Sequence, residues 1–360
     1  MKKAAIYSPY LDSFGGGEKY ILTIAQILSK DYLVDLLFDN HLFSMGSAKL
    51  KKDLAERFNL DLSKVNIVHA PLGKGSNALD RTLFLKKYDL LIYLTDGSIF
   101  NSTAKKNILH IQFPISGQPA ESLWGKIKLK SWDIIIYNSK FTKEHSQKNW
   151  PIKSEVIYPP VDVDKIKPLT KKKYILSVGR FFGYLKSKKQ TVLIEAFKKI
   201  KKNNKSSGWS LHLVGSALAG DLDYLKALKK MAKGMDVNFY PNLRYDDLIK
   251  LYGESSLYWH AAGYKEDDPA KMEHFGIATV EAMAAGCVPV VIGLGGQLEI
   301  LNDGKSGFLW NNLAELEDRS LRLMTDQKLW KALSSAAITK SKNFSKNSFE
   351  NNIKRLITRI

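Results

Sequence analysis

The sequence predicts an α/β protein with two doubly wound parallel-sheet domains. Short β-branched runs alternate with longer segments of helical periodicity along most of the chain, and this is the pattern of parallel βαβ units. The chain has 360 residues, more than a typical domain of about 100 to 200 residues, and 44% of them are hydrophobic, so each half can bury its own core. One large α/β unit is the alternative that the length also allows.

The first half contains six short apolar runs that we interpret as strands, with helices between them. The first helix is expected from about Gly17 to Ser29. Residues 151–173 interrupt the pattern with prolines and charges and are the expected linker. The six expected strands are Ala4–Tyr7, Leu33–Phe38, Val65–His69, Leu90–Leu94, Asn107–Ile111 and Ile134–Asn138.

The second half resumes the alternation and ends, from residue 327 onward, in helices with no further strand. We therefore expect an N-terminal domain at 1–165, a second domain at 166–340, and a C-terminal helix at 341–360 that packs back on the first domain. Ligands of doubly wound sheets bind at the carboxyl ends of the strands, here in a cleft between the domains. The expected strands are Tyr174–Val178, Leu211–Val214, Val237–Tyr240, Leu257–His260 and Val288–Ile292.

The charge of the chain predicts a polyanionic partner. Its 55 Lys and Arg against 36 Asp and Glu give a formal charge of +19. Residues 171–210 alone hold 12 basic residues and one acidic residue, Glu195, so the excess is local. A phosphorylated substrate, an anionic membrane and nucleic acid are the candidate partners. The chain has no nucleic-acid recognition motif, so we expect no nucleic acid partner.

Cysteine content and hydropathy predict a cytoplasmic protein without a membrane span. The single cysteine, Cys287, excludes an intrachain disulfide and a cysteine zinc site. The apolar stretch after Met1 is too short for a signal peptide, and no run approaches the roughly 18 apolar residues of a membrane helix. In the segment Trp124–Trp132 two tryptophans flank three lysines, which fits peripheral contact with an anionic membrane or an amphipathic helix packed on the domain.

The most informative segment holds two carboxylates eight positions apart, Glu273 and Glu281, on either side of Gly276, which opens a predicted helix. The free amides at such a helix start, here those of Phe275, Gly276 and Ile277, favour an anion. A carboxylate accepts hydrogen bonds from two hydroxyls, which suits a sugar or a ribose. Alternatively, Glu273 stabilises the helix start and Glu281 is a solvated helix residue, and the spacing alone does not separate these interpretations.

The sequence around these carboxylates resembles the family 4 retaining glycosyltransferases of the GT-B fold. Their hallmark is Glu-x7-Glu enclosing Phe-Gly, then Glu-Ala-Met-Ala-x-Gly, a Pro-Val-Val strand and Gly-Gly-x-x-Glu. All of these occur here in order, the last two at residues 289–291 and 295–299. The resemblance implies two Rossmann-like domains facing a cleft, and transfer of a hexose from a nucleoside diphosphate sugar to a hydroxyl acceptor. Retention of configuration, and no metal or other cofactor, are also implied.

Residues after the expected strand at 174–178 resemble the family's diphosphate site. Arg180 and Lys188 are implied to bind the donor diphosphate, together with the helix-start amides. A guanidinium makes planar, bidentate hydrogen bonds to phosphate and an ammonium supplies a mobile charge, so the chemistry agrees. The family usually has glycine after the lysine, where this chain has Lys189. By the same resemblance Glu281 binds the ribose and Glu273 the hydroxyls of the transferred sugar.

Two residues of the first half complete the implied site. His110 stands near the end of an expected strand, where related enzymes have a histidine that touches the transferred sugar, although a lone histidine on a strand is more often a core residue. Gly16 belongs to a glycine triplet that resembles the loop approaching the donor phosphates or the acceptor, although a flexible turn is the default interpretation. The absence of Gly-x-Gly-x-x-Gly argues against a nicotinamide site.

The stretch His260–Tyr264 with the acidic insert after it resembles one branch of the family, the mannosyltransferases that extend lipid-linked oligosaccharides and their bacterial relatives. This implies GDP-mannose or a UDP-sugar as donor and a polyprenyl-linked or polysaccharide acceptor. A non-catalytic carbohydrate-binding protein of the same fold, a nucleotide-sugar epimerase and a phosphorylase are the alternatives.

The acidic insert after Tyr264 could be interpreted as a metal site, and two pairs, Asp162 with Asp164 and Asp221 with Asp223, match Asp-x-Asp. Such pairs are common by chance. We interpret them as surface and linker residues, so no metal ligand is assigned.

Overall fold

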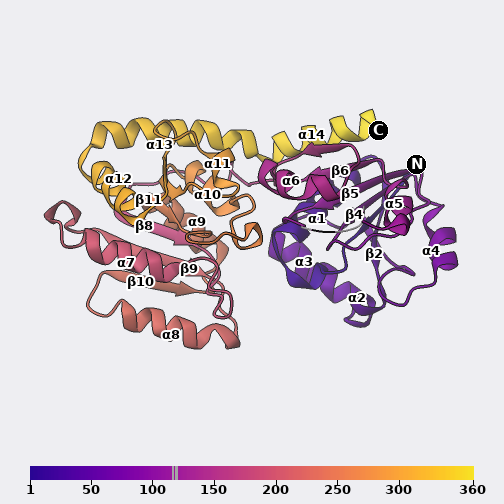
Figure 1. Cartoon of the computed structure of the whole chain (residues 1–360), viewed down its shortest axis with the longest axis horizontal. Helices are drawn as coiled ribbons and strands as arrows, with labels where there is room; N and C mark the ends of the chain where they lie inside the picture. The colour runs from indigo at the N-terminus through magenta and orange to yellow at the C-terminus, as the bar shows by residue number, and fades with distance from the viewer. Residues whose placement is uncertain (116, 118–120) are drawn as a thin grey trace. The chain divides into compact units, whose positions relative to one another are not determined.

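The computed structural model describes residues 1–115, 117 and 121–360, and these form two compact units. Residues 1–160 and 349–360 make the N-terminal unit, and residues 161–348 make the C-terminal unit. Each unit has a parallel β-sheet flanked by helices (Figure 1). The predicted doubly wound α/β fold is therefore confirmed in both halves. The units divide after residue 160, five residues before the predicted limit at 165, and after residue 348, eight residues beyond the predicted limit at 340.

The N-terminal sheet contains the six strands predicted there and one more, β7. The additional strand lies in the segment predicted as a linker. It was missed because it has three residues, two of them polar, and only one neighbouring strand, β6. The strands are β1 (Lys3–Tyr7), β2 (Leu33–Phe38), β3 (Val65–His69), β4 (Leu90–Leu94), β5 (Lys106–Ile111), β6 (Ile134–Tyr137) and β7 (Ser154–Val156), in the order β3-β2-β1-β4-β5-β6-β7.

The helices of this unit begin with α1, whose apolar face packs on the sheet with the side chains of β1, β2 and β4. The end of the chain joins the same core through Phe349, Ile353 and Leu356 of α14. Arg355 of that helix lies 2.6 Å from a carboxylate oxygen of Glu155. The helices are α1 (Gly16–Leu28), α2 (Asn40–Ser44), α3 (Ser47–Phe58), α4 (Ala78–Leu85), α5 (Leu123–Leu129), α6 (Lys140–Ser146) and α14 (Lys346–Arg359), the last beginning in the C-terminal unit.

The C-terminal sheet contains the five predicted strands and a short sixth, β13, which sequence reasoning missed because it has only three residues. Its strands are β8 (Lys172–Val178), β9 (Ser210–Gly215), β10 (Val237–Pro241), β11 (Ser255–His260), β12 (Val288–Ile292) and β13 (Phe308–Trp310), in the order β10-β9-β8-β11-β12-β13. The helices are α7 (Gln190–Ile200), α8 (Leu222–Met231), α9 (Tyr245–Glu254), α10 (Ile277–Ala284), α11 (Gln297–Ile300), α12 (Leu313–Thr325) and α13 (Gln327–Ser341).

Each sheet has one place where the strand order reverses direction. In the N-terminal sheet this place lies between β1 and β4, and in the C-terminal sheet between β8 and β11. At such a point the loops after the two neighbouring strands leave toward opposite sides and open a crevice at the carboxyl edge. The fold therefore singles out one candidate ligand position in each unit.

Candidate functional site

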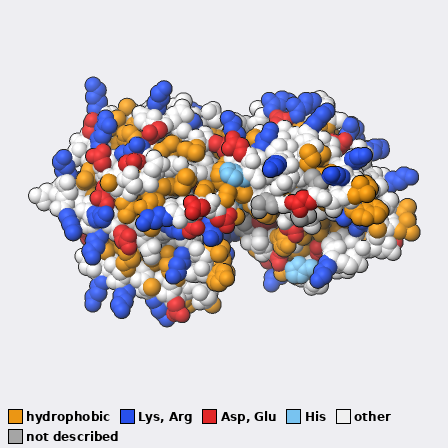
Figure 2. Space-filling model, in the orientation of Figure 1, with side chains coloured by type: hydrophobic (Ala, Val, Ile, Leu, Met, Phe, Trp, Pro, Cys, Tyr) orange, Lys and Arg blue, Asp and Glu red, His pale blue; other side chains and the backbone are white. Residues whose placement is uncertain are grey.

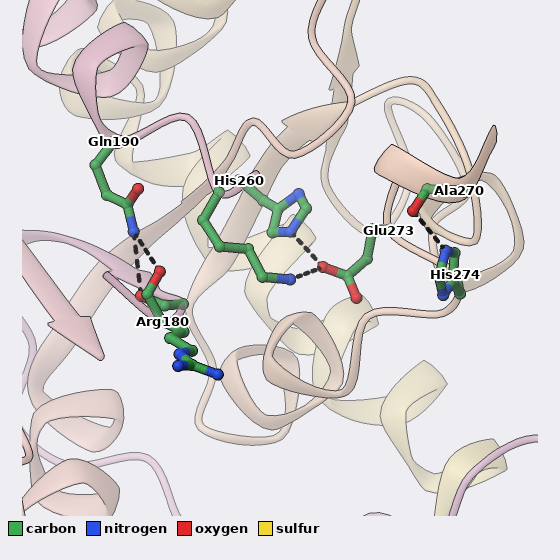
Figure 3. A network of polar contacts seen from close by, with 8 residues as sticks. Arg180, Gln190, His260, Ala270, Glu273 and His274 are labelled. Carbon is green, nitrogen blue, oxygen red and sulfur yellow. Dashed lines mark hydrogen bonds and ion pairs between the residues drawn. The ribbon is translucent and has the colours of Figure 1, made fainter. Parts of the chain in front are cut away.

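The reversal point of the C-terminal sheet brings together Lys188, His260 and Glu273 (Figure 3). Lys188 Nζ lies 2.6 Å from Glu273 Oε2, and His260 Nε2 lies 2.9 Å from the same oxygen. Because the partner of His260 is a carboxylate, Nε2 carries the proton and donates it. The side chains come from the loop after β8, from the end of β11 and from the residues before α10, so three segments far apart in sequence form one network.

The electrostatics of this network keep Glu273 ionised. Burial alone would raise the pKa of the Glu273 carboxyl, but the Lys188 ammonium and the His260 hydrogen bond hold that pKa well below its usual range. Burial lowers the pKa of His260, so its imidazole is neutral at pH 7. The site therefore presents one carboxylate, one ammonium and one neutral imidazole.

Arg180, which was predicted to share the diphosphate with Lys188, lies in the loop after β8 but points its guanidinium elsewhere. Its Nη2 is 3.7 Å from Asp221 Oδ2, and the guanidinium carbon lies 4.3 Å from the centre of the Phe182 ring. The backbone oxygen of Arg180 accepts a hydrogen bond of 3.1 Å from Gln190 Nε2 (Figure 3). The loop is thus fixed at its backbone, while the side chain remains 42% exposed.

The ammonium groups of Lys188 and its neighbour Lys189 contact different carboxylates. Lys189 has a φ of 53°, the left-handed conformation that glycine adopts without strain, which explains why glycine suits this position in related sequences. Its ammonium forms an ion pair with Glu266. Lys188 passes close to Gly179, where an added Cβ would lie 2.8 Å from Lys188 Cγ. The structure therefore directs Lys188, and not Lys189, to Glu273.

The start of α10 lies directly after Glu273. Its N-cap is Gly276 at a φ of 116°, and no side chain caps the helix among the residues described. Gly296 donates its N–H to Glu273 O at 2.8 Å. A Cβ at Gly295 would lie 2.3 Å from that same oxygen. The glycine pair of the Gly-Gly-x-x-Glu motif thus allows two backbones to touch and fixes the segment that carries Glu273 and the helix start.

Glu281, predicted to bind a ribose, lies inside α10 and is only 8% exposed. The hydroxyl of Tyr252 donates to its Oε2 at 3.0 Å. The alternative interpretation of a solvated helix residue is therefore wrong. Phe275, before the helix, is buried and packs its ring against Phe344 at 5.4 Å between centroids.

His110 lies differently from the expectation of a histidine at the sheet edge. Its side chain is completely buried, stacks on Tyr20 at 3.9 Å between ring centroids, and places Nδ1 3.1 Å from the backbone oxygen of Ile136. Burial lowers its pKa to about 4, so it is neutral. The sequence shows that His110 lies near the end of a strand, but not that Tyr20 of α1 covers its ring.

Gln112 directly follows the last residue of β5, Ile111. An added Cβ on Gly17 would overlap its side-chain amide, so Gln112 lies against the glycine triplet. Gly16, the triplet residue singled out from the sequence, is the first residue of α1, and Gly15 N donates to Glu18 Oε2 at 2.8 Å. Sequence reasoning did not single out Gln112, because its contact with Gly17 joins segments far apart in the chain.

Asp221 was interpreted as a surface residue, and this is wrong. It is 4% exposed and accepts the N–H groups of Leu218 and Gly183 at 2.9 and 3.1 Å, which supports the loop facing Arg180. Asp162 is also buried and lies 2.7 Å from Lys346 Nζ. Among the residues that the structure describes, no three His, Cys, Asp or Glu side chains gather as a metal site would require.

Most of the basic segment at 171–210 has carboxylate or carbonyl partners outside this network. Lys172 pairs with Glu254 at 2.9 Å and Lys201 with Asp236 at 2.8 Å. Lys171 donates to backbone oxygens, among them that of Ala285 at 2.6 Å. Lys and Arg side chains are spread over the visible face of both units, with Asp and Glu among them (Figure 2). The local charge excess is therefore largely structural, and Lys188 is the cation of this segment that contacts Glu273.

The two tryptophans of the segment 124–132 have opposite environments. Trp124, on α5, is 73% exposed, whereas Trp132 is buried and donates its Nε1–H to Phe100 O at 3.0 Å. Trp132 therefore packs inside the unit, and of the two tryptophans only Trp124 lies at the surface. Within the described chain, no helix has the length and apolar character needed to cross a membrane.

Residues 161–340 match the family model described as "Glycosyl transferases group 1". Among curated proteins, the chain is 26% identical over 245 residues to a GDP-Man:Man(3)GlcNAc(2)-PP-Dol alpha-1,2-mannosyltransferase of Dictyostelium discoideum, covering 62% of this chain and 46% of that protein. The enzyme of the same name from Mus musculus is 31% identical over 199 residues, covering 49% and 38%. The chain spans less than half the length of these relatives.

Solved structures resemble the whole chain. A glycosyltransferase from Rickettsia africae ESF-5 aligns with a TM-score of 0.75 at 19% identity, covering 99% of this chain and 97% of that one. Alr3699/HepE of Anabaena, solved in complex with UDP and glucose, aligns over 100% of both chains with a TM-score of 0.69 at 19% identity. The predicted GT-B fold is confirmed by these similarities.

Proposed function

Because this chain belongs to the glycosyl transferases of group 1, we propose that it transfers a hexose from a nucleoside diphosphate sugar to a hydroxyl of a glycan or lipid-linked acceptor. The observation that carries this proposal is the Lys188–Glu273–His260 network beside the start of α10. A cation and free helix-start amides suit a diphosphate, and a fixed carboxylate suits sugar hydroxyls.

In this proposal the protein acts mainly through charge. The bond between the sugar C1 and the diphosphate oxygen breaks, and negative charge grows on the leaving diphosphate. Arg180, Lys188 and the amides at Phe275 to Ile277 are proposed to stabilise that charge. Glu273 binds sugar hydroxyls and Glu281 binds the ribose. The network already fixes Glu273 before any donor is bound, so binding requires little reorganisation there.

We further propose that configuration is retained and that no metal or other cofactor is needed. The acceptor oxygen forms its bond to C1 on the face that the diphosphate leaves, and its proton passes to the leaving phosphate oxygen. The products are the glycoside and the nucleoside diphosphate. In this proposal Arg180, Lys188 and the start of α10 supply positive charge to the diphosphate, which supports a mechanism without a divalent ion.

A GDP-sugar, with mannose as the hexose, is the first donor to test. The curated relatives named above are mannosyltransferases whose names include GDP-Man, and this supports GDP-mannose over a UDP-sugar. Their names also include a PP-Dol acceptor, which supports a polyprenyl-linked saccharide over a polysaccharide.

The experiment is to incubate the protein with GDP-, UDP- and ADP-sugars, a mixed lipid-linked glycan fraction and either magnesium or EDTA, and to measure release of the nucleoside diphosphate. We expect release from one donor, GDP-mannose first, at equal rates with magnesium and with EDTA. NMR of the product should show the anomeric configuration of the donor. Release from none of the donors would contradict the function, and a complete loss with EDTA would contradict metal independence.

The helix α5 supports a proposal of peripheral contact with the anionic cytoplasmic face of a membrane. Leu123 and Trp124 are each 73% exposed, and Lys126 and Lys130 beside them are exposed as well. Leu79 and Leu83 of α4 are 65% and 64% exposed. Figure 2 shows hydrophobic side chains gathered at the surface over α5 and α4. Apolar side chains among lysines suit a lipid surface with negative headgroups.

Trp124→Ser should weaken binding to vesicles that contain phosphatidylglycerol by roughly thirtyfold, because about 2 kcal/mol is gained by burying a large part of an indole. The measurement is co-sedimentation with vesicles with and without the anionic lipid. Tyr184→Ser is the matched control, since Tyr184 is 90% exposed on the other unit. Equal sedimentation of Trp124→Ser and the unaltered protein would contradict the membrane proposal.

A further inference from the structure

The N-terminal unit has a pocket of its own at the reversal point of its sheet. The cavity has a volume of about 570 Å³. It opens at the carboxyl ends of β1 to β4, on both sides of the position between β1 and β4 where the strand order reverses. Its volume suits a ligand of one or two sugar rings. The residues that carry the argument are Tyr7, Arg81, Tyr93, Asp96, Phe100 and Lys128.

The wall of this pocket has surfaces suited to a saccharide. Tyr7 and Tyr93 stack with 5.2 Å between ring centroids, and Phe100 lies 5.1 Å from Tyr93. Tyr7 and Tyr93 are each 2% exposed and form the floor of the pocket, whereas the ring of Phe100 is partly exposed and can pack against the C–H face of a sugar ring. At the rim, Asp96 is exposed, and its Oδ2 accepts the hydroxyl of Tyr10 at 3.0 Å. A carboxylate held in this way can accept further hydrogen bonds from sugar hydroxyls.

The same wall contains cations without anionic partners. Arg81 Nε is buried and has no hydrogen-bond partner in the described structure, and its Nη1 has only a long contact of 3.4 Å to Ser76 Oγ. Its guanidinium carbon lies 5.5 Å from the centre of the Phe100 ring. Burial lowers the pKa of Arg81, which reflects the cost of removing this charge from water.

Lys74 and Lys128 line the pocket beside Arg81, and none of the three forms an ion pair within the described ranges. Lys128 is partly buried, whereas Lys126 on the same helix and Lys130 directly after it are exposed. A partly buried guanidinium without an anion is costly, and the cost is recovered when an anionic group binds. Arginine forms bidentate hydrogen bonds with phosphate, which two lysines can reinforce.

We propose that this pocket is the acceptor site and that it binds a saccharide bearing a phosphate group. Arg81, Lys74 and Lys128 bind the phosphate, and the aromatic wall and Asp96 bind the sugar. The inference rests on the proposed glycosyltransferase function, because it identifies the ligand as the acceptor. Lys128 belongs to α5, whose exposed Trp124 is proposed to contact lipid, so a phosphate that joins a saccharide to a lipid is the first source to test.

The experiment measures binding by isothermal titration with three probes: N-acetylglucosamine, N-acetylglucosamine 1-phosphate, and the latter with a citronellyl chain on its phosphate. We expect the phosphorylated sugar to bind at least tenfold more tightly than the neutral one. Arg81→Gln and, separately, Lys128→Gln should each remove most of that preference. Lys130→Gln is the matched control and should keep that preference, because Lys130 is exposed directly after the same helix and does not line the pocket.

Arg180→Ala separates this inference from the donor proposal. If the pocket binds the acceptor, that variant should bind the sugar phosphate as the unaltered protein does. If the unaltered protein binds no nucleotide but binds the sugar phosphate in a way that depends on Arg81, the proposed function is overturned and the sugar-phosphate pocket is still supported. Equal affinities for neutral and phosphorylated sugar, or unchanged affinity in both Arg81→Gln and Lys128→Gln, would overturn the pocket.

The citronellyl probe identifies the source of the phosphate. A further gain of at least tenfold with the chain, lost in Trp124→Ser, supports a lipid-linked acceptor. Equal affinities with and without the chain overturn the lipid source and identify a water-soluble sugar phosphate. Thermal melting of each variant shows whether it is folded. If Arg81→Gln is unfolded, Lys128→Gln alone tests the pocket.

Discussion

Arg180→Ala should lower turnover by about 10² to 10³ while the protein stays folded, because one charge-stabilising contact to a leaving group contributes on that scale. The guanidinium is 42% exposed, and its nearest carboxylate oxygen, on Asp221, lies at 3.7 Å, so little stability depends on it. The measurement is the steady-state rate of nucleoside diphosphate release from the true donor, with circular dichroism and thermal melting to verify the fold.

Lys198→Ala is the control for this substitution. Lys198 belongs to the same basic segment, is exposed on α7 and should keep full turnover when neutralised. Turnover of Arg180→Ala within a few fold of the unaltered protein would show that the arginine does not face the leaving diphosphate. An equal loss in both variants would indicate a general effect of charge and not a specific contact.

Lys188→Met should reduce both turnover and stability. It removes a cation from the proposed diphosphate site and leaves the largely buried Glu273 carboxylate without its ammonium partner at 2.6 Å. Removing one partner of a fully buried pair costs about 3 to 5 kcal/mol; this pair keeps some solvent contact, so we expect about 2 kcal/mol. Chemical denaturation measures the stability loss, and nucleotide release measures turnover.

A double substitution separates the two roles of Lys188. Lys188→Met with Glu273→Gln leaves no unpaired carboxylate, so it should recover most of the lost stability. It should recover no turnover, because the cation and the carboxylate that contact the donor are both gone. Recovery of both stability and turnover would show that the ion pair only supports the fold.

The long apolar runs allowed the parallel sheets to be predicted almost to the residue, since a buried parallel strand is apolar on both faces. The three-residue strands β7 and β13 were missed because they are too short to show a pattern. The Glu273 to Glu281 motif identified the start of α10 because glycine at 276 and small residues in the helix report on backbone geometry. Local sequence signals of this kind predict where a strand or helix begins and ends.

Contacts between segments far apart in the chain could not be predicted from the sequence. The hydrogen bond from His260 to Glu273 joins a strand end to a loop 13 residues later, and nothing local distinguishes His260 from a core histidine. His110 illustrates the converse, because strand alternation does not say that Tyr20 of α1 covers it. The N-terminal pocket is lined by residues from Tyr7 to Lys128 that meet only in the folded sheet.

The crystal structure of the protein with the nucleoside diphosphate of its donor bound tests the central claim most directly. The account predicts that the diphosphate oxygens lie within hydrogen-bond distance of the Arg180 guanidinium, the Lys188 ammonium and the amides at the start of α10, with Glu281 at the ribose. A diphosphate bound at any other place, or one that leaves Arg180 and Lys188 in their present contacts with Asp221 and Glu273 alone, would contradict it.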